Sequence, residues 1–258
     1  DHNGIERKLG LIPPDAEALR IRASRPTFTQ FLQANDLPLY SRQEWQPRDA
    51  RGEFLAEFKG DQQQTSACVS GSARGATMKI RARRGMPFED LSLSFVYSFI
   101  NGGRDAGAMI THSMTALEKY GICKSSLFDL PHIYSNQVSA AAREDGLTRQ
   151  ELKGYTINTL EEFFTAIMIG FVPQFGVCVG SNFNSFSSDG IAGVTGGYAN
   201  HSVHAYGMEK IGSHWCPYTE NDWGFWGPWG NGDFLADERA VRLEDAYVHV
   251  DSEWRNDQ

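Results

Sequence analysis

The chain has 258 residues, of which 41% are hydrophobic and 22% are charged, a composition typical of a globular protein with a large core. Its longest apolar run, 163–172, is shorter than the ~18 residues of a membrane span. Residues 1–86 carry 14 Lys/Arg against 10 Asp/Glu, whereas the rest carries 10 against 22. This acidic remainder disfavours phosphate contacts, so neither a membrane nor a nucleic-acid partner is expected.

The first 36 residues contain three prolines and only short mixed stretches. We interpret 1–36 as an N-terminal arm, which either lies on the body of the protein or contacts a protein partner. From Leu37 the chain is expected to run extended, and a polar loop then leads to Gln62. The pattern divides the remainder into a mainly helical lobe (37–150), a β-rich lobe (151–238) and a C-terminal tail (239–258).

Apolar spacing predicts four helices in the first two thirds of the chain. The expected ranges are Cys68 to about Arg84, Pro87–Ile100, about Ala106–Tyr120, and Leu160–Ile169. Strand patterns follow at Gly176–Gly180 and Ser202–Tyr206, with a Gly/Ser-rich loop over 187–197 and a turn-dense aromatic stretch over 223–232. Helices first and strands later predict an α+β protein with two lobes.

Cys68 stands at the expected start of a helix, where the helix dipole lowers the pKa of a thiol. His201 follows 133 residues later and Asn221 follows 153 residues later. A cysteine followed at about these distances by His and Asn is the order typical of a thiol protease. In such a set the imidazole moves the thiol proton, and an amide orients the ring.

An acyl-transfer site also needs donors for the oxyanion of its tetrahedral intermediate. The backbone N–H of Cys68 is one candidate. The side-chain amide of Gln62, six residues before the cysteine, is the other.

Together these motifs resemble the papain family of cysteine proteases, and most of all its bacterial-type, disulfide-poor members. The resemblance covers about 37–237, in the order of the family's motifs. The matching stretches are the Gln-to-Cys spacing from Gln62 to Cys68, Asn101-Gly102-Gly103, Lys119 to Cys123, Asn200-His201, Asn221-Asp222-Trp223-Gly224, and Gly230-Asn231-Gly232. It implies a two-lobed papain-like fold with Cys68, His201 and Asn221 as triad, Gln62 in the oxyanion hole, and a peptide or protein as substrate. The arm over 1–36 then resembles a short pro-segment.

The same resemblance implies a set of substrate-binding residues. The backbone of Gly102 and Gly103 would pair with the substrate, although these glycines also fit a simple turn. Asp105 and Ser202 match positions near the family's second subsite and suggest a polar or basic substrate side chain there. Trp223 would line the cleft, and packing between the lobes is an equally good interpretation.

The chain departs from the family at its disulfide, because Thr65 and Ile100 stand where the family has paired cysteines. With Cys68 as nucleophile, three cysteines remain, an odd number that favours a reducing, intracellular compartment. No cofactor is expected. A zinc site built from His201, His204, His214 and Cys216 is disfavoured, because His201 and His204 would point to opposite faces of a strand.

Two other functions remain open on the sequence alone. One is a cell-wall peptide hydrolase, which the long separation of Cys68 and His201 disfavours. The other is a papain-like scaffold with a binding or assembly role and little turnover. The complete set of Gln, Cys, His and Asn favours the thiol endopeptidase over both.

Overall fold

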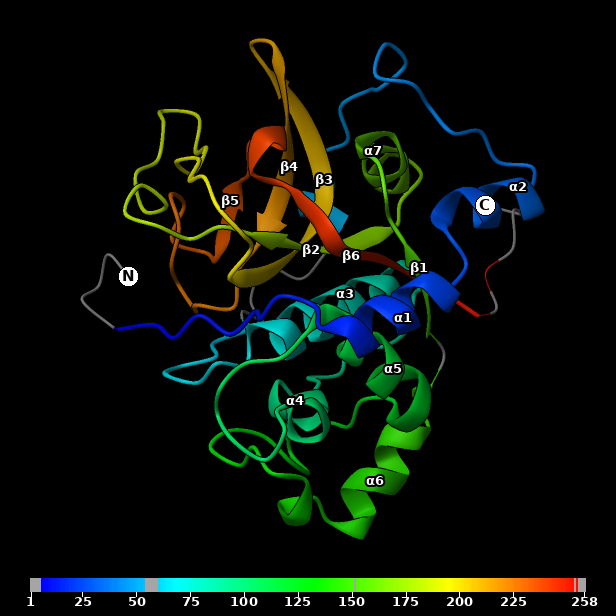
Figure 1. Cartoon of the computed structure of the whole chain (residues 1–258), viewed down its shortest axis with the longest axis vertical. Coiled ribbons are helices and arrows are strands. Elements are labelled where there is room, and N and C mark those ends of the chain that lie inside the picture. The colour runs from blue at the N-terminus through cyan, green and yellow to red at the C-terminus, as the bar shows by residue number, and fades with distance from the viewer. Residues whose placement is uncertain (1–5, 54–59, 151, 253, 255–258) are drawn as a thin grey trace.

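A computed structural model describes residues 6–53, 60–150, 152–252 and 254 of the chain. In Figure 1 a twisted sheet occupies one half of the molecule and a group of helices occupies the other. The predicted α+β class with a helical and a β-sheet lobe is confirmed. None of the described helices is long and apolar enough to cross a membrane.

The helices are α1 (Ala16–Ser24), α2 (Phe28–Ala34), α3 (Cys68–Arg83), α4 (Ser94–Ile100), α5 (Ile110–Tyr120), α6 (Ala140–Leu147) and α7 (Leu160–Met168), with short 3-10 turns at Arg51–Glu53, Ser135–Gln137 and Glu238–Ala240. The strands are β1 (Leu152–Thr156), β2 (Val172–Val177), β3 (His201–Ile211), β4 (His214–Glu220), β5 (Asp233–Leu235) and β6 (Arg242–Asp251).

The helical lobe is built around α3, which runs between the other helices and the sheet (Figure 1). Its apolar core joins Val69 and Ala73 of α3 to residues of α4 and α5 such as Phe95 and Met114. Polar contacts add to this packing, because the Ser70 hydroxyl donates to the carbonyl of Leu93. This packing fixes the first residue of α3, Cys68, at the boundary between the lobes.

The strands form one antiparallel sheet in the order β1-β6-β2-β3-β4-β5. Helix α7 packs on it through an aromatic face, and Phe163 meets Phe175 of β2 edge-on at 5.0 Å between ring centroids. The side chain of Thr159 caps this helix by accepting from the N–H of Glu162. The sheet thus places the start of β3 and the end of β4 side by side.

Two predicted helices begin later than expected. The segment from Pro87 is not helical until Ser94, because Leu91 bridges Lys124 as extended chain. Asp129 then accepts from the N–H groups of Leu93 and Ser94 and starts α4. The helix expected from about Ala106 begins at Ile110. The strand expected at 176–180 lies mostly earlier, at Val172–Val177, whereas the helices from Cys68 and Leu160 are confirmed.

The segments expected as an N-terminal arm and a C-terminal tail both pack on the β-sheet lobe. Within 1–36, helix α2 contributes Phe28, Phe31 and Leu32 to the core of the β-sheet lobe. In the segment 239–258, strand β6 lies between β1 and β2 and pairs with both. Both segments carry large apolar side chains whose packing partners include residues distant in sequence.

Two glycines let α3 approach the sheet closely. A Cβ at Gly71 would lie 2.6 Å from the carboxylate of Asp222, and a Cβ at Gly75 would lie 2.2 Å from the ring of His204. Gly75→Ala is therefore expected to lower the free energy of unfolding by about 1–3 kcal/mol, the usual effect of overpacking. Urea unfolding measures this change. Gly196→Ala, where a Cβ meets open space, should leave the midpoint unchanged, and equal midpoints for both variants would contradict the prediction.

Candidate active site

Cys68 is the first residue of α3 and is fully buried. The residue before it, Ala67, has no side-chain oxygen and makes no side-chain cap at this helix end. The first amide groups of a helix lack intrahelical partners and carry partial positive charge. The sulfur therefore sits at a helix end whose N–H donors no side chain caps.

His201 and Asn221 are brought together by the pairing of β3 with β4. His201 opens β3 and Asn221 directly follows β4, and the imidazole Nε2 lies 2.8 Å from Asn221 Oδ1. Because an amide oxygen can only accept, Nε2 carries the proton and donates. The other ring nitrogen, Nδ1, is buried and has no hydrogen-bond partner among the described residues. It therefore holds a lone pair that can accept a proton.

The backbone of Ser202 joins this strand to the nucleophile. Its N–H donates to Cys68 Sγ at 3.4 Å, so the sulfur lies beside the residue that follows His201. The Ser202 hydroxyl is directed inward, 2.7 Å from Ser72 Oγ, and the side chain is 1% exposed. The structure thus places the amide of Ser202 at the sulfur and its side chain in the interior, away from any substrate surface.

Trp223 packs beside His201, with 4.9 Å between the two ring centroids and a tilt of 41°. It is buried, and it also meets Trp226 and Phe183 edge-on. The indole shields the bond between His201 and Asn221 from water. Trp223 thus acts through packing, and its backbone carbonyl accepts from Arg7.

Gln62 is held by its own loop. Its backbone N–H donates to the carbonyl of Asp222 at 2.8 Å, and its Nε2 donates to the carbonyl of Thr65 at 2.7 Å. The same Nε2 donates to the carbonyl of Lys8 at 2.9 Å. The structure therefore brings Gln62, Cys68, His201 and Asn221 to one place, with a backbone carbonyl already on the Gln62 amide.

Burial sets the protonation states in this conformation. It raises the pKa of the Cys68 thiol to about 12, although N–H groups of Ser202, Gly10 and Val69 act in the opposite direction. Burial lowers the pKa of His201 to about 4, against the effect of the Asn221 hydrogen bond. At neutral pH the pair is therefore an uncharged thiol and an uncharged imidazole, with little thiolate to act as nucleophile.

The extended segment 7–12, here called the cleft strap, covers this site. In Figure 1 the start of the chain runs along the boundary between the sheet and the helices. The carbonyl of Gly10 accepts from Ala108 N–H at 2.7 Å, and Ile12 N–H donates to Ala108 C=O at 3.1 Å. On the opposite side, Leu11 N–H donates to Asn200 C=O at 3.1 Å. The strap thus pairs with both lobes through its backbone.

The strap presents an N–H group to the nucleophile. The Gly10 amide belongs to the groups that lower the thiol pKa. Attack on a peptide requires the opposite arrangement, with a carbonyl carbon facing the sulfur. The strap therefore fills the site around Cys68 with its own backbone.

Gly102 and Gly103 were expected to pair with a substrate backbone, and this stays a prediction. Gly102 and Gly103 form a turn with φ of +63° and +78°, and an added Cβ on either would meet nothing within 4 Å. Ala108, after Gly107, makes the backbone bonds to the strap instead. Asp105 lies close to the strap and pairs with the Lys8 ammonium at 2.9 Å.

Three of these residues were missed by the sequence interpretation: Gly10, Gly107 and Ala108. Gly107 has a φ of +96°, and a Cβ there would lie 2.4 Å from the Gly10 carbonyl oxygen. One signal for this position is present in the chain, because Gly107 lies three residues before the helix that starts at Ile110. The segment around Gly10 offers no such signal.

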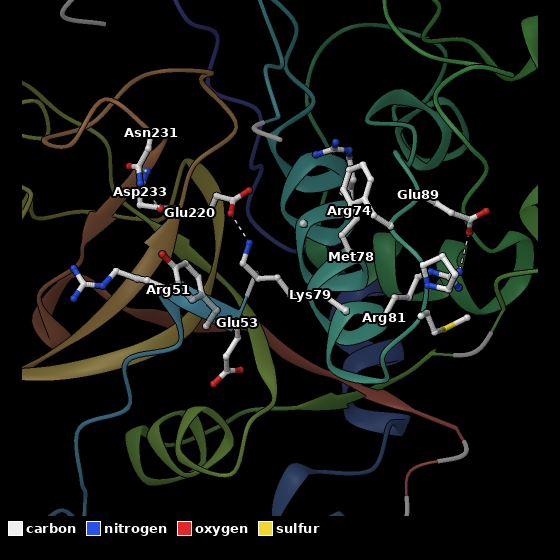
Figure 2. Close-up of a pocket in the computed structure, with 16 residues that line it drawn as sticks. Arg51, Glu53, Arg74, Met78, Lys79, Arg81, Glu89, Glu220, Asn231 and Asp233 are labelled. Carbon is white, nitrogen blue, oxygen red and sulfur yellow. Dashed lines mark hydrogen bonds and ion pairs between the residues drawn. The ribbon is translucent and has the colours of Figure 1, made fainter. Parts of the chain in front are cut away.

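A separate cavity of about 400 Å³ lies between α3 and the β-sheet lobe. Figure 2 shows Lys79 directed at Glu220 and Arg81 directed at Glu89 across it. Among the described residues that line the cavity there is no Cys, Ser or Thr. The two ion pairs balance the charges of Lys79 and Arg81. We therefore assign the chemistry to the site at Cys68.

The fold is that of papain-like cysteine proteases, as three solved structures illustrate. Xylellain, a cysteine protease from Xylella fastidiosa, is similar with a TM-score of 0.66 and 18% identity over 95% of this chain and 97% of that chain. The ragweed pollen cysteine protease Amb a 11, in its proform, is similar with a TM-score of 0.67 and 16% identity over 85% of this chain and 62% of that chain.

The cysteine protease and lectin-like domains of Cwp84 from Clostridium difficile are similar with a TM-score of 0.66 and 16% identity. This likeness covers 97% of this chain and 58% of that chain. No family model and no curated protein sequence matches the chain. At these identities the likeness shows the fold, and the function rests on the site.

Proposed function

We propose that the chain is a papain-like thiol endopeptidase that cleaves peptide bonds through a Cys68 acyl-enzyme. The orientation of His201 carries this proposal. Its Nε2 is hydrogen-bonded to Asn221, and its Nδ1 has no hydrogen-bond partner among the described residues. The next residue, Ser202, donates its backbone N–H to the Cys68 sulfur. A histidine kept only for packing would have no need of a free, buried lone pair beside a thiol.

The residues divide the reaction between them. His201 accepts the thiol proton at Nδ1 as the sulfur attacks the carbonyl carbon, and then gives it to the leaving amine. Asn221 keeps the ring in the tautomer that this transfer needs. Gln62 Nε2 and the N–H of Cys68 stabilise the oxyanion. Water then releases the acyl group, with His201 taking the water proton, and restores the thiol.

The cleft strap makes the described conformation a latent one in this proposal. It places the Lys8 carbonyl on Gln62 and the Gly10 amide on the sulfur, two positions that a substrate must occupy. The N-terminal segment is thus assigned an inhibitory contact over 7–12 and a structural role over α2. The peptide or protein substrate of the enzyme would enter the site once the strap leaves it.

Selective alkylation of Cys68 tests the proposal. In a Gly10→Ala chain, whose strap is expected to be displaced, a peptide-like electrophile for thiol proteases is expected to label Cys68 at neutral pH, as located by mass spectrometry, and His201→Ala should slow this labelling. Cys178, which is partly exposed, offers a matched thiol in the same chain, so Cys178→Ala should retain the adduct and Cys68→Ala should lose it. Labelling spread equally over both cysteines would favour a scaffold without turnover, and cleavage of cell-wall peptides alone would favour the other alternative.

A further inference from the structure

The carboxylate of Asp105 is fixed in the wall of the cleft. Its Oδ1 accepts from the N–H of Ser66 and from the hydroxyl of Tyr97, each at 2.8 Å. Its Oδ2 faces the strap and binds the Lys8 ammonium at 2.9 Å. Ser66 lies two residues before the nucleophile. The carboxylate is therefore held beside Cys68 by two donors, with one oxygen left for a cation.

Lys8 shows which substrate residue would reach this carboxylate. Its own carbonyl accepts from Gln62 Nε2 at 2.9 Å, while its side chain reaches Asp105. In a substrate, the carbonyl bound by the oxyanion donors belongs to the residue on the acyl side of the scissile bond. Lys8 meets one of these donors, Gln62 Nε2, and its side chain reaches Asp105 from there.

The electrostatics of this position favour a cation. The Asp105 side chain is only 18% exposed, and burial acts to raise its pKa. Hydrogen bonds from Lys8, Ser66 and Tyr97 outweigh burial and lower that pKa, so the group is a carboxylate at neutral pH. A neutral side chain in place of Lys8 would leave Oδ2 without its charged partner, and such a loss is costly in a partly buried site.

We propose that Asp105 selects lysine or arginine as the substrate residue whose carbonyl is attacked. This inference rests on the proposed protease function and adds its substrate class. Each substrate would place its basic side chain where the Lys8 ammonium lies in the latent form. The strap would therefore bind Asp105 through the Lys8 ammonium, at the position where the substrate later places its own cation.

The test compares matched peptides that carry arginine or its uncharged isostere citrulline on the acyl side of the cleaved bond. It uses the full-length Gly10→Ala chain, whose strap is expected to be displaced. A charged hydrogen bond of this kind predicts kcat/KM about 10- to 100-fold higher for arginine. Asp105→Asn, which keeps an oxygen for Ser66 and Tyr97, should bring the ratio close to one.

A second acidic residue that faces the strap supplies the control. Asp61 pairs with Arg7, and Asp61→Asn in the same background should retain the arginine-to-citrulline ratio. Rates of Cys68 inactivation by arginyl and citrullinyl chloromethyl ketones provide a readout that needs no turnover. These rates should show the same ratio and the same loss in Asp105→Asn.

Equal rates for the two peptides in Gly10→Ala, or a ratio that survives Asp105→Asn, would overturn the role of Asp105. Because the peptides would still be cleaved in either case, the protease function would stand. Absence of both cleavage and Cys68 labelling would instead overturn the protease function together with this inference.

Discussion

His201→Ala is expected to lower kcat/KM for a peptide substrate by about 10³-fold or more, the scale seen when a triad base is removed. Without the imidazole, nothing described in the site takes the thiol proton or returns it to the leaving amine. The thiol would also remain protonated, since burial already raises its pKa. Steady-state kinetics in the Gly10→Ala background, with unfolding followed in parallel, measure this loss.

Two further variants define what the result means. Asn221→Ala should cost less than His201→Ala, because Asn221 orients the ring at Nε2 and transfers no proton itself. His132 lies on the surface of the helical lobe, so His132→Ala should retain full activity. A His201→Ala enzyme within about tenfold of its parent would contradict the assignment of His201 as the base.

The residues that we propose as catalytic could be selected from the sequence because their chemistry is local and their order is specific. Cys68 follows Gln62 by six residues, and helix α3 begins at Cys68 as expected. The strand pattern at Ser202–Tyr206 lies within β3, which begins one residue earlier, at His201. Sequence patterns of this kind identify which residue types can react and which elements carry them.

The backbone that pairs with the strap could not be predicted in the same way. Gly102 and Gly103 match a two-glycine motif, and Gly107 with Ala108 does not, yet Ala108 is the residue that pairs with the strap. Backbone hydrogen bonds carry no side-chain signature, so only the position of the loop relative to Cys68 distinguishes the two candidates. The Ser202 side chain was misplaced for a related reason, because the alternation of a strand does not show which face meets the interior.

The two termini illustrate the limit set by long-range packing. Helix α2 and strand β6 belong to the core of the β-sheet lobe, but each depends on partners distant in the sequence. Phe28 of α2 meets Phe171, 143 residues on, and β6 pairs with β2 residues that lie 66 to 77 positions earlier. The cleft strap is a still harder case. Its residues bind mainly through backbone groups and two ion pairs to aspartates, Asp61 and Asp105, which the sequence cannot match to Arg7 and Lys8.

Gly10→Ala is expected to raise kcat/KM of the full-length chain by about 10- to 100-fold. A Cβ on Gly10 would lie 1.9 Å from the carbonyl oxygen of Ser66, a backbone atom that cannot rotate away. Overpacking of this kind costs about 1–3 kcal/mol, which here falls on the bound form of the strap alone. With the strap displaced, the sulfur gains contact with water, and its pKa falls from the value that burial imposes.

Peptide cleavage and the rate of Cys68 alkylation at pH 7 both report this release, and both should rise in the same variant. Gly196→Ala adds the same methyl group in open space and should change neither rate. The midpoint of thermal unfolding distinguishes release of the strap from destabilisation of the whole protein. Gly10→Ala should leave this midpoint nearly unchanged, because Gly10 lies in the strap and outside the core. If Gly10→Ala matched the parent chain in both rates, the strap would have to leave the cleft freely, and the inhibitory role assigned to residues 7–12 would be wrong.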